Sequence, residues 1–348
     1  MTDILAELAY LHGKPTSKAK IKAIPEHFVV RENLGFEFSG TGEHLMVRIR
    51  KTGENTSFVA NELAKVCGVK SKDVGWAGLK DRHAVTEQWL SIHLPKSETP
   101  DFSSFEEQYP SIQILETARH NRKLRPGDLI GNDFEITLSE VTDIDDVESR
   151  IKQVIESGVP NYFGAQRFGQ DGSNLSEARR WGRDNVRTRN QNKRSLYLST
   201  ARSWIFNHIV STRLINGVFN KLILGDIVTK PDSTITVDQA NIAVFQAELS
   251  SGSISLTAAL AGDNALPTKE NALETEQAIV DAEPDLMALI RGNRMRHDRR
   301  DVLLKPCDLS YEIKNNLVVL LFSLSSGSFA TSIVRELIEE IPVERQFD

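Results

Sequence analysis

The sequence predicts an α+β protein in which a mixed, largely antiparallel sheet carries an inserted, mostly helical α/β domain. Two observations predict this class. Runs that alternate between apolar and polar residues occur in the first third of the chain, and a further strand-like run lies near its end. Apolar residues at helical spacing dominate the middle. We therefore expect both chain ends, residues 1–155 and 304–348, to build the sheet, and residues 156–303 to form the inserted domain.

Short apolar runs predict the strands. Leu45, Val47 and Ile49 alternate with Met46 and Arg48, as expected of a strand with one buried face. The runs that predict strands are residues 45–50, 90–94, 112–114, 134–138 and 317–324.

Apolar residues three and four positions apart predict the helices. The clearest helix is expected over residues 200–218, where Phe206, Ile209, Val210 and Leu214 fall on one face. The other expected helices are residues 58–66, 147–155, 174–182 and 330–341.

Composition excludes several classes of protein. The chain has 348 residues, of which 40% are hydrophobic and 26% are charged, as in ordinary globular proteins. No apolar run is long enough to span a bilayer, and no secretory signal is visible at the N-terminus, so we expect a cytoplasmic protein without membrane contact. The two cysteines, Cys67 and Cys307, are far apart in the sequence, which argues against a disulfide scaffold or a thiolate metal site.

The common cofactor and metal motifs are absent from the sequence. It contains no Walker A loop, no GxGxxG, no HExxH and no GxSxG. We therefore expect no metal and no organic cofactor, and any chemistry has to rest on common side chains.

Charge is distributed unevenly along the chain. Residues 160–214 hold ten Arg and Lys against three acids, whereas residues 224–290 hold eleven acids against two Lys. Residues 291–305 are basic again, with six cations against two acids. Any one such run is most simply a solvated helix face, but several basic runs, one with aromatic residues interleaved, favour binding of nucleic acid.

The segment GWAGLKDRHAVTEQWLSIHLP, residues 75–95, contains the sharpest candidate for chemistry. Asp81 lies between Lys80 and Arg82, with His83 next to it. Neighbouring cations keep a carboxylate ionised, so Asp81 could serve as a nucleophile or a base. Without other information, an Asp that bonds backbone amides in a turn is the simpler explanation.

A second candidate segment, PNYFGAQRFGQDGSNL, spans residues 160–175. Its aromatic residues and Arg167 suit stacking on bases and contacts to phosphates. A glycine-kinked loop pinned to the core by its aromatic rings explains the pattern equally well.

Both segments resemble signature motifs of the TruD family of tRNA pseudouridine synthases. Residues 75–89 match GxAGLKDRxAVTxQW, and residues 161–169 match NYFGxQRFG. Residues 226–285 carry no motif of the family. Four further matching segments, in chain order, are residues 22–32, 119–134, 202–213 and 325–336.

The resemblance implies a pseudouridine-synthase type of catalytic domain that requires no cofactor. The implied reaction isomerises uridine-13 of tRNA, with the glutamate-accepting species expected, by cleaving the glycosidic bond, rotating the base and rejoining it through C5. By motif position the essential aspartate is Asp81. Three routes stay open, in which Asp81 attacks C1′, attacks C6, or assists a glycal pathway.

The resemblance also implies site residues around Asp81. Lys22 is the expected basic partner of Asp81, with Lys80 and Arg82 as alternatives. The flipped base is expected to contact Phe28, Asn132 and Phe329; Phe134 is a further candidate, although its strand parity suits the core equally well.

Cations of the inserted domain are expected to contact RNA phosphates, with the acidic residues 224–290 facing away from the RNA. The expected partner is tRNA, and the expected state is a monomer. The candidate backbone contacts are Arg167, Arg187, Arg189, Lys193 and Arg194.

Two other classes remain open from the sequence. One is a catalytically inactive RNA-binding protein or RNA chaperone of the same fold, against which the intact Asp81 argues. The other is an enzyme acting on free nucleosides or sugars, which usually pairs two carboxylates; Glu87 is the only other acid near Asp81 in the sequence.

Overall fold

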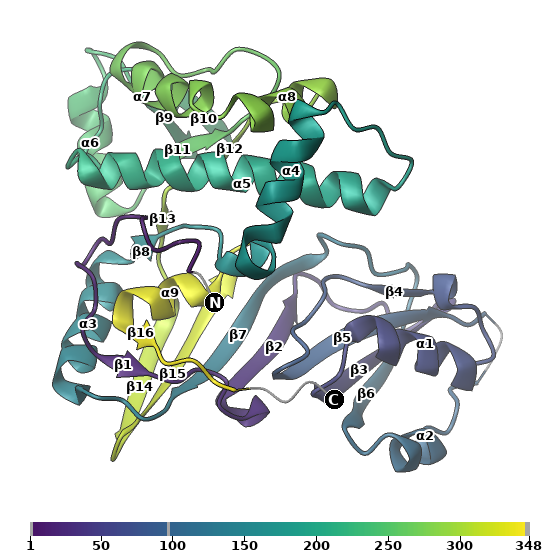
Figure 1. The fold of residues 1–348 in the computed structure, drawn as a ribbon. Helices are drawn as coiled ribbons and strands as arrows, with labels where there is room; N and C mark the ends of the chain where they lie inside the picture. The colour runs from purple at the N-terminus through teal and green to yellow at the C-terminus, as the bar shows by residue number, and fades with distance from the viewer. Residues whose placement is uncertain (1–2, 96–97, 345–348) are drawn as a thin grey trace. The chain divides into compact units, whose positions relative to one another are not determined.

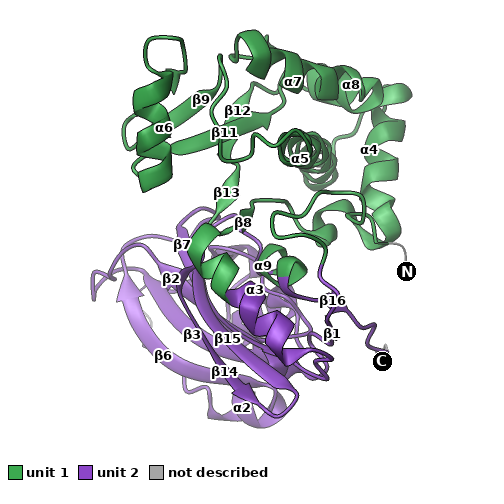
Figure 2. Cartoon of the chain, turned by 90° about the vertical axis from the view of Figure 1, so that its left-hand side faces the viewer, with its two compact units in different colours: residues 1–14, 152–305, 331–336 green, residues 15–151, 306–330, 337–348 purple. Residues whose placement is uncertain are grey.

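The computed structural model describes residues 3–95 and 98–344 (Figure 1). The chain forms two compact units, which Figure 2 colours separately. The sheet unit comprises residues 15–151, 306–330 and those from 337 onward. The insertion unit comprises the residues up to 14, residues 152–305 and residues 331–336.

The sheet unit is built on one mixed sheet with the strand order β14-β15-β7-β2-β5-β3-β6, and β4 pairs with β5. Within this sheet the β2–β5 pairing is parallel and the other pairings are antiparallel, which confirms the predicted sheet type. The strands are β2 (Phe28–Leu34), β3 (His44–Thr52), β4 (Val74–Trp76), β5 (Val85–His93), β6 (Ile112–His120), β7 (Leu129–Leu138), β14 (Cys307–Lys314) and β15 (Leu317–Ser325).

One face of this sheet carries a hydrophobic core. Val47 of β3 and Leu90 of β5 pair directly, and they share a fully buried cluster with Val59 and Leu63 of α1 (Thr56–Val66) and Phe105 of α2 (Ser103–Gln108). Because side chains alternate along a strand, Leu45, Val47 and Ile49 of β3 and Leu90 and Ile92 of β5 face this core. The alternating runs at residues 45–50 and 90–94 are therefore confirmed as strands.

The insertion unit contains a second, antiparallel sheet with the strand order β10-β9-β11-β12. Its long helix α5 contacts β11 and the helices α4, α7 and α8 (Figure 1). The strands are β9 (Ile227–Lys230), β10 (Ser233–Thr236), β11 (Ser255–Leu260) and β12 (Asp298–Asp301); the helices are α4 (Ser173–Arg183), α5 (Gln191–Ile215), α6 (Ile242–Ser251), α7 (Glu270–Asp281) and α8 (Pro284–Gly292).

Two predicted helices have different ends in the structure. The helix expected over residues 200–218 begins at Gln191, because Asn190 caps it by accepting a hydrogen bond from the Lys193 amide. The helix expected over residues 330–341 is α9 (Ala330–Leu337), and it ends early because β16 (Glu339–Glu340) pairs in parallel with β1 (Lys18–Ala19). Further elements are α3 (Ile144–Ser157) and the short paired strands β8 (Val159–Pro160) and β13 (Leu303–Leu304). The short 3-10 helices are η1 (Pro25–His27), η2 (Ser71–Asp73), η3 (Ala165–Phe168) and η4 (Gln170–Gly172).

The units group two segments differently from the expected domains. The residues up to 14 and residues 331–336 belong to the insertion unit. The Arg335 guanidinium donates to the carbonyls of Leu5 and Leu8 at 3.0 and 2.6 Å, and Glu336 accepts from the Leu11 amide at 2.7 Å. These hydrogen bonds join the two segments, which lie at opposite ends of the sequence.

A buried ion pair joins the end of α5 to the start of β9. The Arg213 guanidinium donates to both carboxylate oxygens of Asp226, at 2.9 and 3.0 Å, and both side chains are almost fully buried. Arg213 also donates to the carbonyls of Val218 and Lys221. Its charge is therefore matched inside the protein, and Arg213 helps to hold the loop after α5.

Replacing Asp226 tests how much this pair stabilises the insertion unit. Asp226→Asn leaves the Arg213 charge buried without a counter-charge, so we expect it to lower the free energy of unfolding by about 3–5 kcal/mol. Urea denaturation measures the change. Asp232→Asn, at an exposed position in the same acidic stretch, is the matched control. A difference between the two variants below about 0.5 kcal/mol would contradict the prediction.

Candidate active site

Asp81 lies in the loop between β4 and β5, and side chains of the sheet and of α1 hold this loop in place. Lys51 donates to the Asp81 carbonyl at 3.1 Å, and Gln88 donates to the Gly78 carbonyl at 3.1 Å. The Lys80 amide donates to the Thr56 hydroxyl at 3.2 Å. Groups of the scaffold therefore fix the backbone that leads up to Asp81 and Asp81 itself.

The Asp81 carboxylate is ionised and remains accessible. Its Oδ2 accepts from the Lys22 ammonium, and its Oδ1 accepts from the His83 amide at 2.8 Å. Partial burial alone would raise the pKa of Asp81, but the charge and hydrogen bond of Lys22, together with the His83 amide, lower it below its usual value. The Asp81 side chain is 38% exposed, so an ionised carboxylate faces solvent at neutral pH.

Lys22 is held in an unusual position. Its backbone has a φ of +52°, a conformation that a lysine rarely adopts, and its ammonium lies 4.2 Å from the centroid of the Phe28 ring. The side chain is only 13% exposed. Strained backbone of this kind persists where the surrounding contacts over-determine it, and it is common at functional sites.

Lys80 and Arg82, which flank Asp81 in the sequence, bind groups other than the Asp81 carboxylate. Lys80 pairs with Glu32 at 3.0 Å, with both side chains nearly inaccessible to solvent, and Arg82 donates to the Gly53 carbonyl at 3.3 Å. Of the three basic partners considered for Asp81, the structure therefore places Lys22 in contact with its carboxylate.

Glu87 takes no part in this site. Its side chain is 3% exposed and receives hydrogen bonds from Arg48 and Arg50 at 2.9 and 2.6 Å. Burial would raise the pKa of Glu87, but the bond and charge of Arg50, with the charges of Arg48 and Arg31, lower it. Since Glu87 and Gln88 are adjacent on β5, they point to opposite faces of the sheet, and only Gln88 contacts the Asp81 loop. Glu87 is therefore not placed to act with Asp81 as the second carboxylate of a glycosidase-like pair.

Aromatic rings pack next to Lys22. Phe28 meets Phe134 edge to face, with 6.2 Å between ring centroids, and Phe134 stacks on Phe322 at 5.4 Å. Phe28 is 5% exposed and Phe134 is 9% exposed, so both rings are buried; Phe28 lies against the Lys22 ammonium, and Phe134 packs against Phe28. A contact of either ring with a flipped base stays a prediction.

Asn132 lies on the same sheet face as Phe28 and Phe134. On β7 it is opposite Glu32 of β2, the partner of Lys80, and opposite Leu324 of β15. Its side-chain oxygen is buried and accepts no hydrogen bond from any described residue. A buried amide without a partner is costly, and an N–H donor of a ligand would satisfy it.

Phe329 directly precedes α9, in a turn that is tied to the start of β7. The Ser326 amide donates to the Ile130 carbonyl at 2.8 Å, and Ser325 is opposite Gly131 in the sheet. Gly131 is required here because a Cβ at this position would lie 2.4 Å from the Leu324 carbonyl oxygen. This close approach of β7 and β15 brings the turn of Phe329 next to the strand of Asn132.

The candidate RNA contacts lie in the insertion unit. Arg187 and Arg189 are exposed in the loop between α4 and α5, and Lys193 and Arg194 are exposed in the first turn of α5. Arg167 differs, since it is half-buried and donates to the Ser199 hydroxyl. Four of the five residues therefore form one exposed basic segment, residues 187–194.

Part of the acidic stretch has a structural role that the sequence did not reveal. Glu276 is buried, accepts from the Ala259 amide at 2.7 Å and pairs with Arg299 at 2.7 Å. Glu283 binds Arg179 at 2.8 Å and the Trp204 indole at 2.9 Å. These acids neutralise neighbouring cations and stabilise the unit.

Sequence reasoning missed Lys51 and Glu32. Lys51 is fully buried and follows Leu45, Val47 and Ile49 in the series of residues on β3 that face the core. A charged residue at a position of the alternating pattern that is otherwise apolar is the sequence signal that indicates such a buried lysine. Glu32 shares the parity of Phe28 on β2 in the same way.

No described residues form a group of three or more His, Cys, Asp or Glu that could hold a metal ion. None of the helices in the described part of the chain is long and apolar enough to cross a membrane.

The family model of tRNA pseudouridine synthase D (TruD) matches residues 5–180 and 173–337 of the chain. A tRNA pseudouridine synthase D from Vibrio vulnificus (strain YJ016) is 70% identical over 347 residues, which cover 100% of both chains. The corresponding protein of Vibrio cholerae (serotype O1, strain M66-2) is 67% identical, covering 100% of this chain and 96% of that one. A crystal structure from Methanosarcina mazei, described as a tRNA pseudouridine synthase D (TruD), superposes with a TM-score of 0.71 at 22% identity. The match covers 95% of this chain and 94% of that one and shows a shared fold.

Lys51 gives a test of how the Asp81 loop is positioned. Burial lowers the pKa of the Lys51 ammonium to about 8, although the charge of Asp81 partly opposes this. As the pH rises through about 8, the folded protein loses this proton, which an exposed lysine keeps until about pH 10.5. Lys51 therefore makes the folded state more stable as the pH rises from 8 to 10.5, while its charge-assisted bond to the Asp81 carbonyl weakens.

We expect Lys51→Met to remain folded and to lower kcat about 10- to 100-fold with little change in KM, because the loop loses an anchor. The wild-type kcat should decline above pH 8, and the variant should lack this basic limb. Turnover of tRNA between pH 6 and 9.5 measures both effects. The control is Lys65→Met on the exposed face of α1. A Lys51→Met profile that superposes on the wild-type one would exclude this role.

Proposed function

We propose that this chain, which belongs to the TruD family of tRNA pseudouridine synthases and is an isomerase, converts uridine-13 of tRNA to pseudouridine. The proposed substrate is the glutamate-accepting tRNA. We further propose that the protein acts as a cytoplasmic monomer, and that the reaction uses side chains alone, without metal or cofactor. The proposal depends most on one observation, the ionised and accessible Asp81 carboxylate paired with Lys22.

Isomerisation requires a carboxylate that is ionised and yet partly desolvated. Lys22 supports the first requirement by lowering the pKa of Asp81, and the packed loop supports the second. In the C1′ route Asp81 displaces uracil from the ribose, the base rotates, and C5 displaces Asp81 while the C5 proton leaves. In the C6 route Asp81 adds to the base, and in the glycal route it assists departure of uracil and removes a ribose proton; the same Asp81 geometry serves all three.

The target base has to leave the RNA stack to reach Asp81. We propose that the buried oxygen of Asn132 accepts the N3–H of uracil, because this oxygen has no partner among the described residues. Phe329, in the adjacent turn, would stack on the base, while Phe28 and Phe134 support the site from below.

Residues 187–194 would hold the RNA backbone. Lys193 and Arg194 lie in the first turn of α5, where positive charge opposes the helix dipole and slightly destabilises the helix. Bound phosphates would remove this repulsion. Such contacts position RNA without reading its sequence.

The chemical proposal is tested by the release of tritium from tRNA labelled at uridine C5, since formation of the C1′–C5 bond expels that atom. We expect Asp81→Asn to release tritium at less than roughly a thousandth of the wild-type rate while binding tRNA normally. Asp145→Asn, an exposed change in α3 of the same unit, is the control.

Equal release by wild type and Asp81→Asn would keep the activity and remove Asp81 from its role. Tight binding without release by the wild-type protein would indicate the inactive RNA-binding alternative. Sequencing of the modified tRNA then identifies the position and the tRNA species.

The RNA contacts are tested by reversing charge in the exposed basic segment. The double variant Arg187→Glu, Arg189→Glu should weaken tRNA binding by roughly tenfold or more and reduce the slope of log affinity against log salt by about two. Filter binding at several salt concentrations measures both quantities. Unchanged affinity and slope would show that this loop does not contact RNA.

A further inference from the structure

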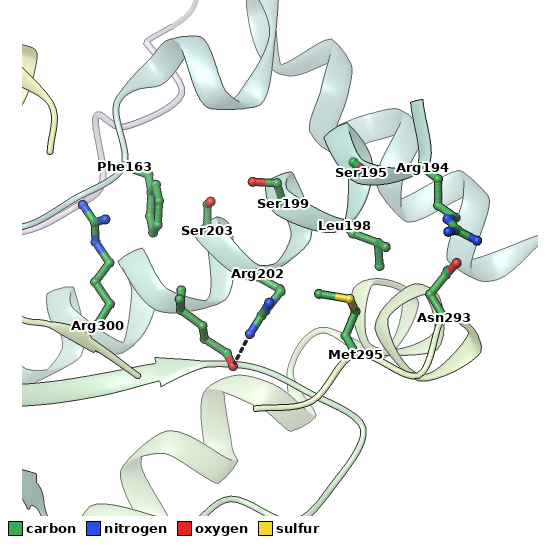
Figure 3. A pocket seen from close by; sticks show the side chains of 11 residues that line it. Phe163, Arg194, Ser195, Leu198, Ser199, Arg202, Ser203, Asn293, Met295 and Arg300 are labelled. Carbon is green, nitrogen blue, oxygen red and sulfur yellow. Dashed lines mark hydrogen bonds between the residues drawn. The ribbon is translucent and has the colours of Figure 1, made fainter. Parts of the chain in front are cut away.

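The insertion unit contains a pocket of about 480 Å³ that no step above uses. Figure 3 shows Arg194 and Asn293 at one end, Phe163 and Arg300 at the other, and Arg202 between them. The Arg194 end is exposed, whereas Phe163 is 8% exposed. The pocket is therefore more open at the start of α5 than at its Phe163 end. Its lining residues are Phe163, Arg194, Ser195, Leu198, Ser199, Arg202, Ser203, Leu260, Asn293, Met295 and Arg300.

The charge of the pocket lining favours binding of an anion. It includes three arginines and no Asp or Glu. Arg202 donates through one nitrogen to the carbonyls of Leu260 and Arg296 at 3.2 and 3.1 Å, and its buried Nε has no hydrogen-bond partner among the described residues. Arg194 forms no ion pair with any described residue.

Arg300 adds a third positive charge at the Phe163 end. Its guanidinium donates to the Asn161 side-chain oxygen at 2.9 Å and lies 4.0 Å from the Phe163 ring centroid. Burial lowers the pKa of Arg300 to about 10 and also lowers that of Arg202. Gathering partly buried cations without a carboxylate in the lining is costly, and a bound anion would offset this cost.

The other walls suit the base of a nucleotide. Ser195, Ser199 and Ser203 follow one another at four-residue spacing along one face of α5, and their small side chains leave the space open. Leu198, Leu260 and Met295 supply apolar surface. The volume lies within the range of small-ligand pockets and exceeds what a bare phosphate needs.

We propose that this pocket receives one nucleotide of the bound RNA, with its phosphate at Arg194 and Arg202 and its base against the apolar wall. An RNA nucleotide fits better than a free one because the open end lies at Arg194, within the exposed basic segment 187–194 that would hold the RNA backbone. The inference rests on the proposed function, and it adds a second point at which a nucleotide leaves the RNA stack.

Blocking the pocket without changing any charge tests the proposal. Ser195→Phe places a ring at the open end, at an exposed helical position where it should not disturb folding. Leu196→Phe places the same ring at the next exposed position of α5, outside the pocket, and is the matched control. We expect Ser195→Phe to weaken tRNA binding by roughly tenfold and Leu196→Phe to leave it unchanged.

The outcomes separate this proposal from the proposed function. If both phenylalanine variants bind tRNA like the wild type while Arg187→Glu, Arg189→Glu does not, the pocket proposal is wrong and the RNA contacts stand. If all of these proteins bind alike, both proposals fail. Titration with uridine 5′-monophosphate and with inorganic phosphate shows whether the pocket binds a small molecule instead. If either binds with micromolar affinity, and Ser195→Phe leaves the affinity for tRNA unchanged, the pocket is a small-molecule site and the assignment to RNA is overturned.

Discussion

The ion pair between Lys22 and Asp81 is the interaction on which the proposed chemistry depends. A carboxylate at the edge of a packed sheet would tend to take up a proton, and Lys22 prevents this by its charge and its hydrogen bond. The pair requires a strained Lys22 backbone, a ring of Phe28 beneath the ammonium and a loop anchored by Lys51. Each of these features is costly or unusual by itself, and together they hold one ionised group in place.

A single sheet face provides both the core and this support. Along β3 the inward-facing residues are apolar until Lys51, and along β2 they change from Phe28 and Val30 to Glu32. The loop that carries Asp81 provides partners for both polar residues: Lys80 pairs with Glu32, and the Asp81 carbonyl accepts from Lys51. Lys51 also donates to the Glu54 carbonyl, before α1. The rigidity of the core is therefore transmitted directly to the site, as precise positioning of a catalytic group requires.

The insertion unit uses its charges in two ways. Arg213 and Arg299 are buried or nearly so, and each is paired with a carboxylate from the acidic stretch. Arg187, Arg194 and Arg202 have no carboxylate partner among the described residues. Arg187 and Arg194 lie next to or in the exposed first turn of α5, and Arg202 lies further along this helix in the pocket. The division explains how a chain with a net charge of −6 can present a basic surface to a polyanion.

Local patterns in the sequence determined the sheet class, the main strands and helices, and, through the family motifs, Asp81 and its candidate partners. Periods of 2 and 3.6 residues are properties of neighbours in the chain, so they can be read without a structure. The strands of the insertion sheet were not predicted, since they are short and lack clear alternation. Only the tertiary structure decided that Lys22, 59 residues from Asp81 in the sequence, contacts the Asp81 carboxylate, and that Lys51 anchors the loop of Asp81. It also decided that arginines from α5 and β12 line one pocket. Such contacts depend on strand register and on packing between distant segments, which no local pattern encodes.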